Sequence, residues 1–245
     1  MTATLYRTPH SPSTVTASTA AAGYAATNVL TTSIGRPWRS TTTGSSTLIV
    51  NLGSSKAVVG IAVNHINASS VTVHADNSAT PTTSRGTLTS YADEQGRRKG
   101  LLAFSATVRY LMLTFSGTPT DAAAYWTAGS VYVFSASGAL PRDPLMGSDQ
   151  SVDYPQLTQR LPNGQTLRID RGVSRMSVRL RFNGRITDDI AALARYARSG
   201  KVWLDMGLPT AQGCQWPLTH VDDGITRQWA GHNREPMTIP LLELA

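Results

Sequence analysis

The sequence predicts a mainly β protein built from two domains. Short runs of β-branched and apolar residues recur between turns rich in Ser, Gly and Thr, and no long helical period competes with them. The composition also changes near residue 140, from Thr-, Ser-, Ala- and Gly-rich to dense in arginine and carboxylate. We therefore expect an N-terminal β-sandwich or jelly roll, followed by a second β-barrel or sandwich domain with one short helix.

The strands of the first domain are predicted by alternation and by β-branched runs. They are expected at residues 47–52, 57–63, 71–75, 109–115 and 130–135. The cluster Gly53–Ser55 is expected to form a turn between the first two, and the second is expected to be buried on both faces. In residues 109–115, Leu111, Leu113 and Phe115 share one side of the strand.

Prolines and glycines mark the domain boundary. The segment 137–148 holds two of each, and proline bars helix continuation while glycine loosens the chain. The predicted first domain is residues 1–139, the linker is 140–148, and the second domain is 149–245.

The second domain has the clearest alternation in the chain, in residues 174–182. Its apolar face consists of Met176, Val178, Leu180 and Phe182. A helix is expected from Thr187, its N-cap, to Gly200, which ends it. Strands are expected at 202–204, 225–229 and 237–244, with a turn at 222–224, and Pro240 predicts that the last strand lies at a sheet edge.

Arginines on the opposite face of residues 174–182 form a candidate subunit interface. Arg175, Arg179 and Arg181 share one strand face with Ser177, and like charges two residues apart on one face, such as Arg179 and Arg181, repel unless partners pair with them. Carboxylates of the same chain and a neighbouring subunit are equally good partners, and DNA is a distant third.

Composition and motifs argue against most other functions. The net charge of +7 permits acidic partners without demanding nucleic acid, which is not expected, and no apolar run is long enough to span a membrane. The single cysteine, Cys214, excludes an internal disulfide and a Cys-based zinc site, and no cofactor or metal is expected. Phosphate-binding and nucleophile motifs are absent, and Cys214 with His220 and Asp222 is more often an incidental grouping than a catalytic one. No enzymatic activity is expected.

The first domain resembles the galactose-binding-like (discoidin-type) domains. The resemblance lies in the order of four segments, residues 26–30, Pro37–Ser40, 48–53 and 58–63, followed by two core strands at 109–113 and 131–134. It implies a ligand site in the loops at one end of a sandwich, here at residues 35–39, 64–67 and 91–99. The candidate glycan-binding residues are the platforms Tyr91 and Trp126 and the polar partners Asn67 and Arg97. Trp38 is expected to plug the sandwich rather than to bind sugar.

The second domain resembles the distal-tail or tail-hub domains of bacteriophages. The order of elements carries this resemblance: an arginine-rich strand, a short helix, Gly200–Trp203 and a closing apolar strand. It implies a structural component of a tail tip or baseplate that forms a homo-oligomeric ring and contacts other tail proteins. Such a protein would be located in the virion after assembly in the host cytoplasm. The alternative function is a carbohydrate-binding module that attaches the particle to a host surface glycan.

Overall fold

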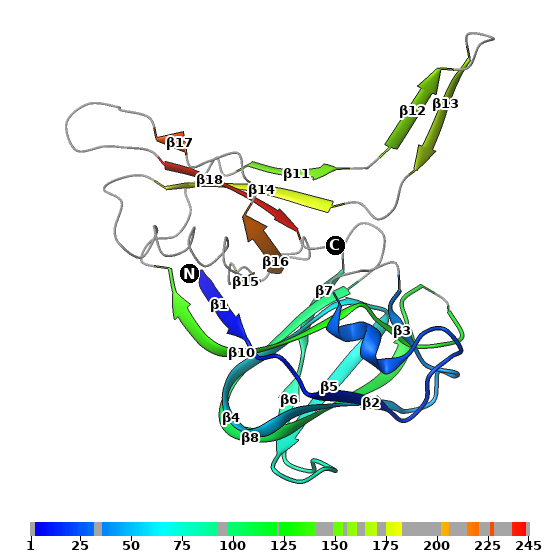
Figure 1. Cartoon of the computed structure of the whole chain (residues 1–245), viewed down its shortest axis with the longest axis vertical. Coiled ribbons are helices and arrows are strands. Elements are labelled where there is room, and N and C mark those ends of the chain that lie inside the picture. The colour runs from blue at the N-terminus through cyan, green and yellow to red at the C-terminus, as the bar shows by residue number, and fades with distance from the viewer. Residues whose placement is uncertain are drawn as a thin grey trace.

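The computed structural model is mainly antiparallel β, which confirms the predicted fold class (Figure 1). It describes residues 3–31, 36–92, 98–121, 123–140, 149–153, 156–160, 165–170, 175–182, 202–205, 215–220, 226–227 and 237–243. The elements of the first half are β1 (Thr4–Pro9), β2 (Thr14–Ala17), η1 (Ala26–Leu30), β3 (Trp38–Arg39), β4 (Ser46–Ile66), β5 (Ala68–Asp76), β6 (Ser84–Thr87), β7 (Thr89–Ala92), β8 (Arg98–Pro119), β9 (Thr127–Ala128) and β10 (Ser130–Ala139). Those of the second half are β11 (Asp149–Asp153), β12 (Gln156–Arg160), β13 (Thr166–Asp170), β14 (Arg175–Phe182), β15 (Val202–Asp205), β16 (Gln215–His220), β17 (Thr226–Arg227) and β18 (Met237–Glu243).

Two long strands, β4 and β8, belong to both layers of the first half. Residues 46–51 of β4 pair with residues 110–115 of β8, and β2, β5 and β6 extend this layer. Beyond a bend, residues 60–66 of β4 pair with residues 98–103 of β8, and β1, β10 and β7 extend the second layer. Because both strands curve from one layer into the other, the pair encloses the core between them (Figure 1).

The bend corrects the prediction of two separate strands at 47–52 and 57–63. The strand is continuous, and its register with β8 shifts between Asn51 and Lys56. Gly53 has a φ of +81°, and its amide donates to Oδ1 of Asn51 over 2.8 Å. The turn residues are therefore present, but they form an irregularity within a paired strand, where bulges commonly bend a sheet.

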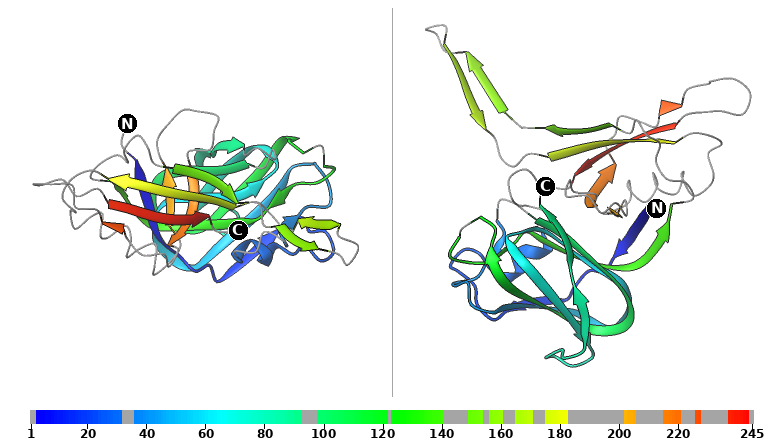
Figure 2. Two further views of the ribbon diagram at one scale, coloured as in Figure 1. Left: turned by 90° about the horizontal axis from the view of Figure 1, so that it is seen from above. Right: turned by 180° about the vertical axis from the view of Figure 1, so that it is seen from behind.

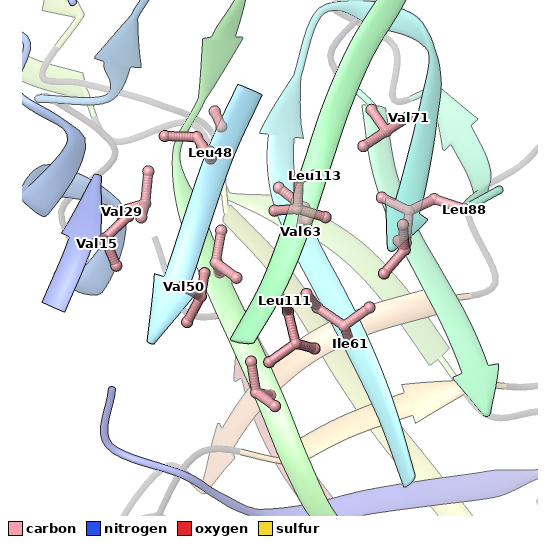
Figure 3. Packing of buried hydrophobic residues seen from close by; sticks show 14 of the residues in the cluster. Val15, Val29, Leu48, Val50, Ile61, Val63, Val71, Leu88, Leu111 and Leu113 are labelled. Atoms are coloured by element: carbon pink, nitrogen blue, oxygen red, sulfur yellow. The ribbon is translucent and has the colours of Figure 1, made fainter. Parts of the chain in front are cut away.

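The core lies between the two layers (Figure 3). Leu48, Val50, Leu111 and Leu113 come from one layer, and Ile61 and Val63 come from the other. Leu111, Leu113 and Phe115 are each fully buried, which confirms the alternation predicted for residues 109–115. Burying each of these side chains contributes about 1.5–3 kcal/mol relative to exposure.

Strand β1 joins the two halves of the chain. Residues 4–7 of β1 pair with β10 on one side, and residues 4–6 pair with β15 on the other. Trp203 of β15 is fully buried, with its ring centroid 6.0 Å from that of Tyr132, and it shares an apolar cluster with Tyr6 and Phe134. This cluster covers the outer face of the second layer, and residues 60–66 of β4 are buried on both faces. The burial predicted for residues 57–63 is thus confirmed for residues 60–63, whereas Ala57 is exposed and Val59 is half-buried.

The predicted domain boundary falls beside this junction. Strand β10 continues through Ala139, and Leu140 is buried, its amide donating to the carbonyl of Ala3. Residues 141–148 of the predicted linker lie outside the described part of the chain. The division into domains 1–139 and 149–245 therefore stays a prediction. In the structure, strands of both predicted domains belong to one sheet, through the pairing of β1 with β15.

The last strand, β18, is not an edge strand, so the prediction from Pro240 was wrong. Strand β18 lies between β14 and β16, and β17 also pairs with it. On the side away from β14, β17 pairs with residues 237–238 of β18 and β16 pairs with residues 241–243. Pro240 lies in the gap between them, so in the described sheet it has a partner only in β14. A proline needs no ladder hydrogen bond at such a gap. The predicted helix 187–200 and turn 222–224 lie outside the described residues.

A β-hairpin projects from the second half. Strands β12 and β13 pair only with each other among the described strands, and in Figures 1 and 2 they extend away from the remaining strands. The register places Leu157 opposite Ile169.

Replacing Trp203 by alanine is expected to loosen the junction between the halves. The loss of a buried indole typically costs about 3–5 kcal/mol, because the surrounding side chains fill the cavity only in part. We expect a separate, earlier unfolding transition of the second half in urea, with faster proteolysis after residue 140. A variant that unfolds in one transition at the parent's urea concentration would contradict this role of Trp203.

Candidate functional site

Asn67 organises one end of the sandwich. It follows the buried end of β4 and is 3% exposed. Its Oδ1 accepts the amide of Thr127 over 2.8 Å, and its Nδ2 donates to the carbonyl of Tyr125 over 2.9 Å. The same Nδ2 donates to Oδ1 of Asp121 over 3.0 Å, and the carbonyl of Asn67 accepts the amide of Thr120. One amide side chain therefore fixes the course of residues 120–127.

Two buried tryptophans anchor the small sheet formed by β3 and β9. Trp38 pairs with Ala128 and is fully buried, its Nε1 donating to the carbonyl of Thr19 and its ring centroid lying 5.0 Å from that of Phe115. Trp126 is also fully buried, and its Nε1 donates to the carbonyl of Gly44 over 2.7 Å. Both indoles are thus core residues with satisfied N–H groups, as buried tryptophans usually are. Trp38 plugs the sandwich, as expected.

The half-buried side chains of Tyr24, Arg39 and Tyr125 meet beside this sheet. We call them the tyrosine–arginine cluster. The Cζ atom of Arg39 lies 3.9 Å from the ring centroid of Tyr24 and 5.0 Å from that of Tyr125. Both distances are within the range of cation–π attraction, worth about 0.5–1 kcal/mol at exposed sites and more where the cation is desolvated.

Backbone hydrogen bonds hold the segments that carry this cluster. The amide of Arg39 donates to the carbonyl of Tyr24, and the carbonyl of Arg39 accepts the amide of Ala21. Tyr125 is held through its carbonyl by Asn67. The cluster therefore combines two aromatic rings and a cation on fixed backbone, which is the combination of apolar face and oriented polar groups that small-ligand sites use.

The four predicted glycan-binding residues have different surroundings in the structure. The Trp126 platform is corrected, because a ring with no exposed surface presents no face to a ligand. Asn67 uses its amide to hold residues 121–127 rather than to reach solvent. Tyr91 lies in β7 opposite Lys99, with its side chain outside the described part, and Arg97 is also outside it.

The cluster lies beside predicted ligand residues, but its own three side chains were not predicted as a group. Arg39 ends the predicted ligand loop 35–39, and Tyr125 precedes the predicted Trp126. Tyr24 lies in a Gly-Tyr-Ala segment with no strand or helix pattern. The two tyrosines are close to the arginine in space but distant from it in the sequence, so no sequence pattern predicts that they meet.

Strand register bears on the candidate subunit interface. Asp149 lies opposite Arg179, and Asp153 lies opposite Arg175, in the antiparallel pair of β11 and β14. Directly opposite residues share a face, and opposite charges there stabilise the pair by about 0.2–1 kcal/mol. Arg179 is exposed, and Arg181 lies opposite Thr238 of β18. The register therefore supplies carboxylates of the same chain for Arg175 and Arg179, whereas for Arg181 it supplies a threonine.

Other kinds of site were sought in the described part of the chain. It contains no group of three or more His, Cys, Asp or Glu residues placed to hold a metal ion. It also contains no helix of the length and hydropathy that crossing a membrane would require. Cys214 and Asp222 lie outside the described residues.

Comparison with known proteins gives structural neighbours only. No family model matches the chain, and no curated protein matches its sequence. One similar solved structure is a chitosan-binding module derived from a chitosanase/glucanase of Paenibacillus sp. IK-5, with 26% identity, a TM-score of 0.42, and coverage of 52% of this chain and 98% of that one. Another is the family 32 carbohydrate-binding module (CBM32) of AlyQ in complex with 4,5-unsaturated mannuronic acid, with 20% identity, a TM-score of 0.44, and coverage of 53% and 99%. A third is the family 32 module of C. perfringens NanJ in complex with galactose, with 19% identity, a TM-score of 0.42, and coverage of 53% and 98%. These neighbours are carbohydrate-binding modules, each match covers about half of this chain, and all three TM-scores are below 0.5.

Replacing Asn67 by alanine is expected to destabilise the segment that carries Tyr125. The change leaves the Thr127 amide and the Tyr125 carbonyl without their partner, and each buried unsatisfied group costs about 1–3 kcal/mol. Thermal denaturation should show a lowered midpoint. Asn77→Ala is the matched control, because Asn77 is exposed and accepts only the hydroxyl of Ser55. Equal midpoints for the two variants would contradict the role assigned to Asn67.

Proposed function

We propose that the first half of the chain is a non-catalytic carbohydrate-binding module whose ligand contacts the tyrosine–arginine cluster. The observation that carries the proposal is the contact of Arg39 with both Tyr24 and Tyr125. Aromatic rings pack against the apolar C–H faces of a sugar, while guanidinium and phenol groups donate to its oxygens. The cluster supplies both kinds of contact at one place.

The support around the cluster fits a binding site rather than a catalytic one. Asn67 holds the carbonyl of Tyr125, and the buried indoles of Trp38 and Trp126, next in sequence to Arg39 and Tyr125, donate to the carbonyls of Thr19 and Gly44. A rigid site binds with less loss of conformational entropy than a flexible one. Hydrolysis of a glycosidic bond would require two carboxylates on opposite sides of the bond, and among the described residues Asn67 binds one, Asp121.

The test is glycan binding by the purified chain and by a matched pair of tyrosine variants. Tyr125→Ala should weaken binding about tenfold or more, because it removes one ring of the cluster. Tyr110→Ala is the control: Tyr110 also lies under an arginine, Arg109, with 4.9 Å between Cζ and the ring centroid, but at the bend of β4 and β8. Binding to a glycan array followed by titration calorimetry measures the difference.

Two results would contradict the proposal. One is an array on which the intact chain binds no glycan. The other is a glycan whose affinity falls equally in Tyr125→Ala and Tyr110→Ala, which would place the ligand elsewhere.

A second function is proposed for the second half: attachment of the chain to a larger assembly. The hairpin β12–β13 favours it, since an isolated two-stranded hairpin is only marginally stable in water and gains stability from a partner. The register places Leu157 opposite Ile169 and Gln159 opposite Leu167. The assembly proposed from the sequence is a bacteriophage tail tip or baseplate, in which copies of the chain form a ring with other tail proteins.

Replacing residues 156–170 by a short Gly-Ser linker tests this second function. We expect the variant to keep its circular dichroism spectrum and melting temperature, since the hairpin pairs with no other described strand. Sedimentation should then show that the intact chain oligomerises and that the variant does not. A monomeric intact chain at high concentration, or a variant that still oligomerises, would contradict the role of the hairpin.

A further inference from the structure

Two arginines of the first half lie over tyrosine rings, and only one of them has a hydrogen-bond acceptor. Nε of Arg109 donates to Oδ1 of Asn51 over 3.2 Å. Nε of Arg39 is buried and has no acceptor, and within the part of the chain that the structure describes Arg39 has no ion pair. Leaving a buried donor unsatisfied costs about 1–3 kcal/mol, and more for a charged group. The guanidinium of Arg39 is therefore a cation whose polar partner is missing from the described chain.

The Arg39 guanidinium is also restrained. Its Cζ atom contacts the rings of Tyr24 and Tyr125, and the backbone of Arg39 is hydrogen-bonded to Tyr24 and to Ala21. A guanidinium held by aromatic rings loses little further freedom when it binds, and its planar fork matches the two oxygens of a carboxylate. The rings also displace water from it, which strengthens its attraction for an anion.

We propose that the ligand of the tyrosine–arginine cluster is an acidic sugar, and that the carboxylate of a uronic acid pairs with the guanidinium of Arg39. This inference rests on the proposed function and names the chemical class of its ligand. The sugar ring packs on a tyrosine while the carboxylate accepts N–H groups from the terminal nitrogens of Arg39; Nε is buried and lies out of its reach. A neutral sugar would leave the charge of Arg39 unpaired.

Net charge alone is the competing explanation for binding an acidic glycan. The chain carries +7, which attracts any polyanion at low salt. Such attraction is screened over about 8 Å at physiological ionic strength and does not depend on the shape of one side chain. Arg39→Lys keeps the charge and removes the fork, so it separates the two explanations. Arg109→Gln removes one charge elsewhere and serves as the matched control.

The experiment uses polygalacturonate and its fully methyl-esterified form, which share a backbone and differ in the carboxylate charge. Calorimetric titration of the intact chain at 150 mM salt should show binding to polygalacturonate at least tenfold tighter than to the ester. Arg39→Lys and Arg39→Gln should each reduce affinity for polygalacturonate about tenfold, the loss typical of a charge-assisted hydrogen bond. Arg109→Gln should change it less than twofold. Melting temperatures of all variants identify any that fail to fold, and Arg39→Lys keeps a cation at this position.

Each outcome is decisive. Equal affinity for polygalacturonate and its ester, or equal losses in Arg39→Lys and Arg109→Gln, would overturn the acidic-sugar assignment. Binding of neutral glycans on the array without binding of polygalacturonate would overturn it and leave the proposed function standing. Binding of dextran sulfate but not polygalacturonate would replace the carboxylate by a sulfate and so overturn the uronic acid. Failure to bind any glycan would overturn both proposals.

Discussion

The bend shared by β4 and β8 is the constraint on which the first half depends. Each strand pairs in one layer before the bend and in the other layer after it, so a single strand pair sets the spacing of the sandwich. Gly53, at a φ of +81°, lies in the register shift, where a residue with a side chain would be strained. The same pair fixes the far end of the sandwich, because β4 ends at Ile66, immediately before Asn67. From there one buried amide positions the segment that carries Tyr125.

The candidate site follows from packing that leaves few choices. Trp38 and Trp126 fill the core, and their indole N–H groups bond to carbonyls of the chain. Arg39 follows Trp38 in the sequence and Tyr125 precedes Trp126, and both neighbours are half-buried. The buried indoles thus determine where the guanidinium and the phenol lie, and the cation–π contacts hold them together. The position of the proposed binding site is therefore a consequence of how the core is closed at this end.

Much of the fold was predictable from the sequence, and the site was predictable only as a region. Alternation in residues 109–115 predicted which face is buried, since strand side chains alternate. Pro240 misled, because a gap between two neighbouring strands accommodates a proline as well as a sheet edge does. The prediction that Trp126 is a binding platform was wrong, because the indole is turned inward and is fully buried. Pairs made between distant segments, such as Asp149 with Arg179 or Arg39 with Tyr24, depend on strand register and loop course, which local patterns do not specify.

The central claim is that a glycan binds at the tyrosine–arginine cluster. The most direct measurement is a crystal structure of the chain with an oligogalacturonide, or mapping of the same ligand by chemical-shift changes. The account predicts that the sugar ring contacts Tyr24 or Tyr125 and that its carboxylate lies within hydrogen-bond distance of Arg39. A ligand bound at the bend beside Arg109, or shift changes that leave residues 24, 39 and 125 unaffected, would contradict it.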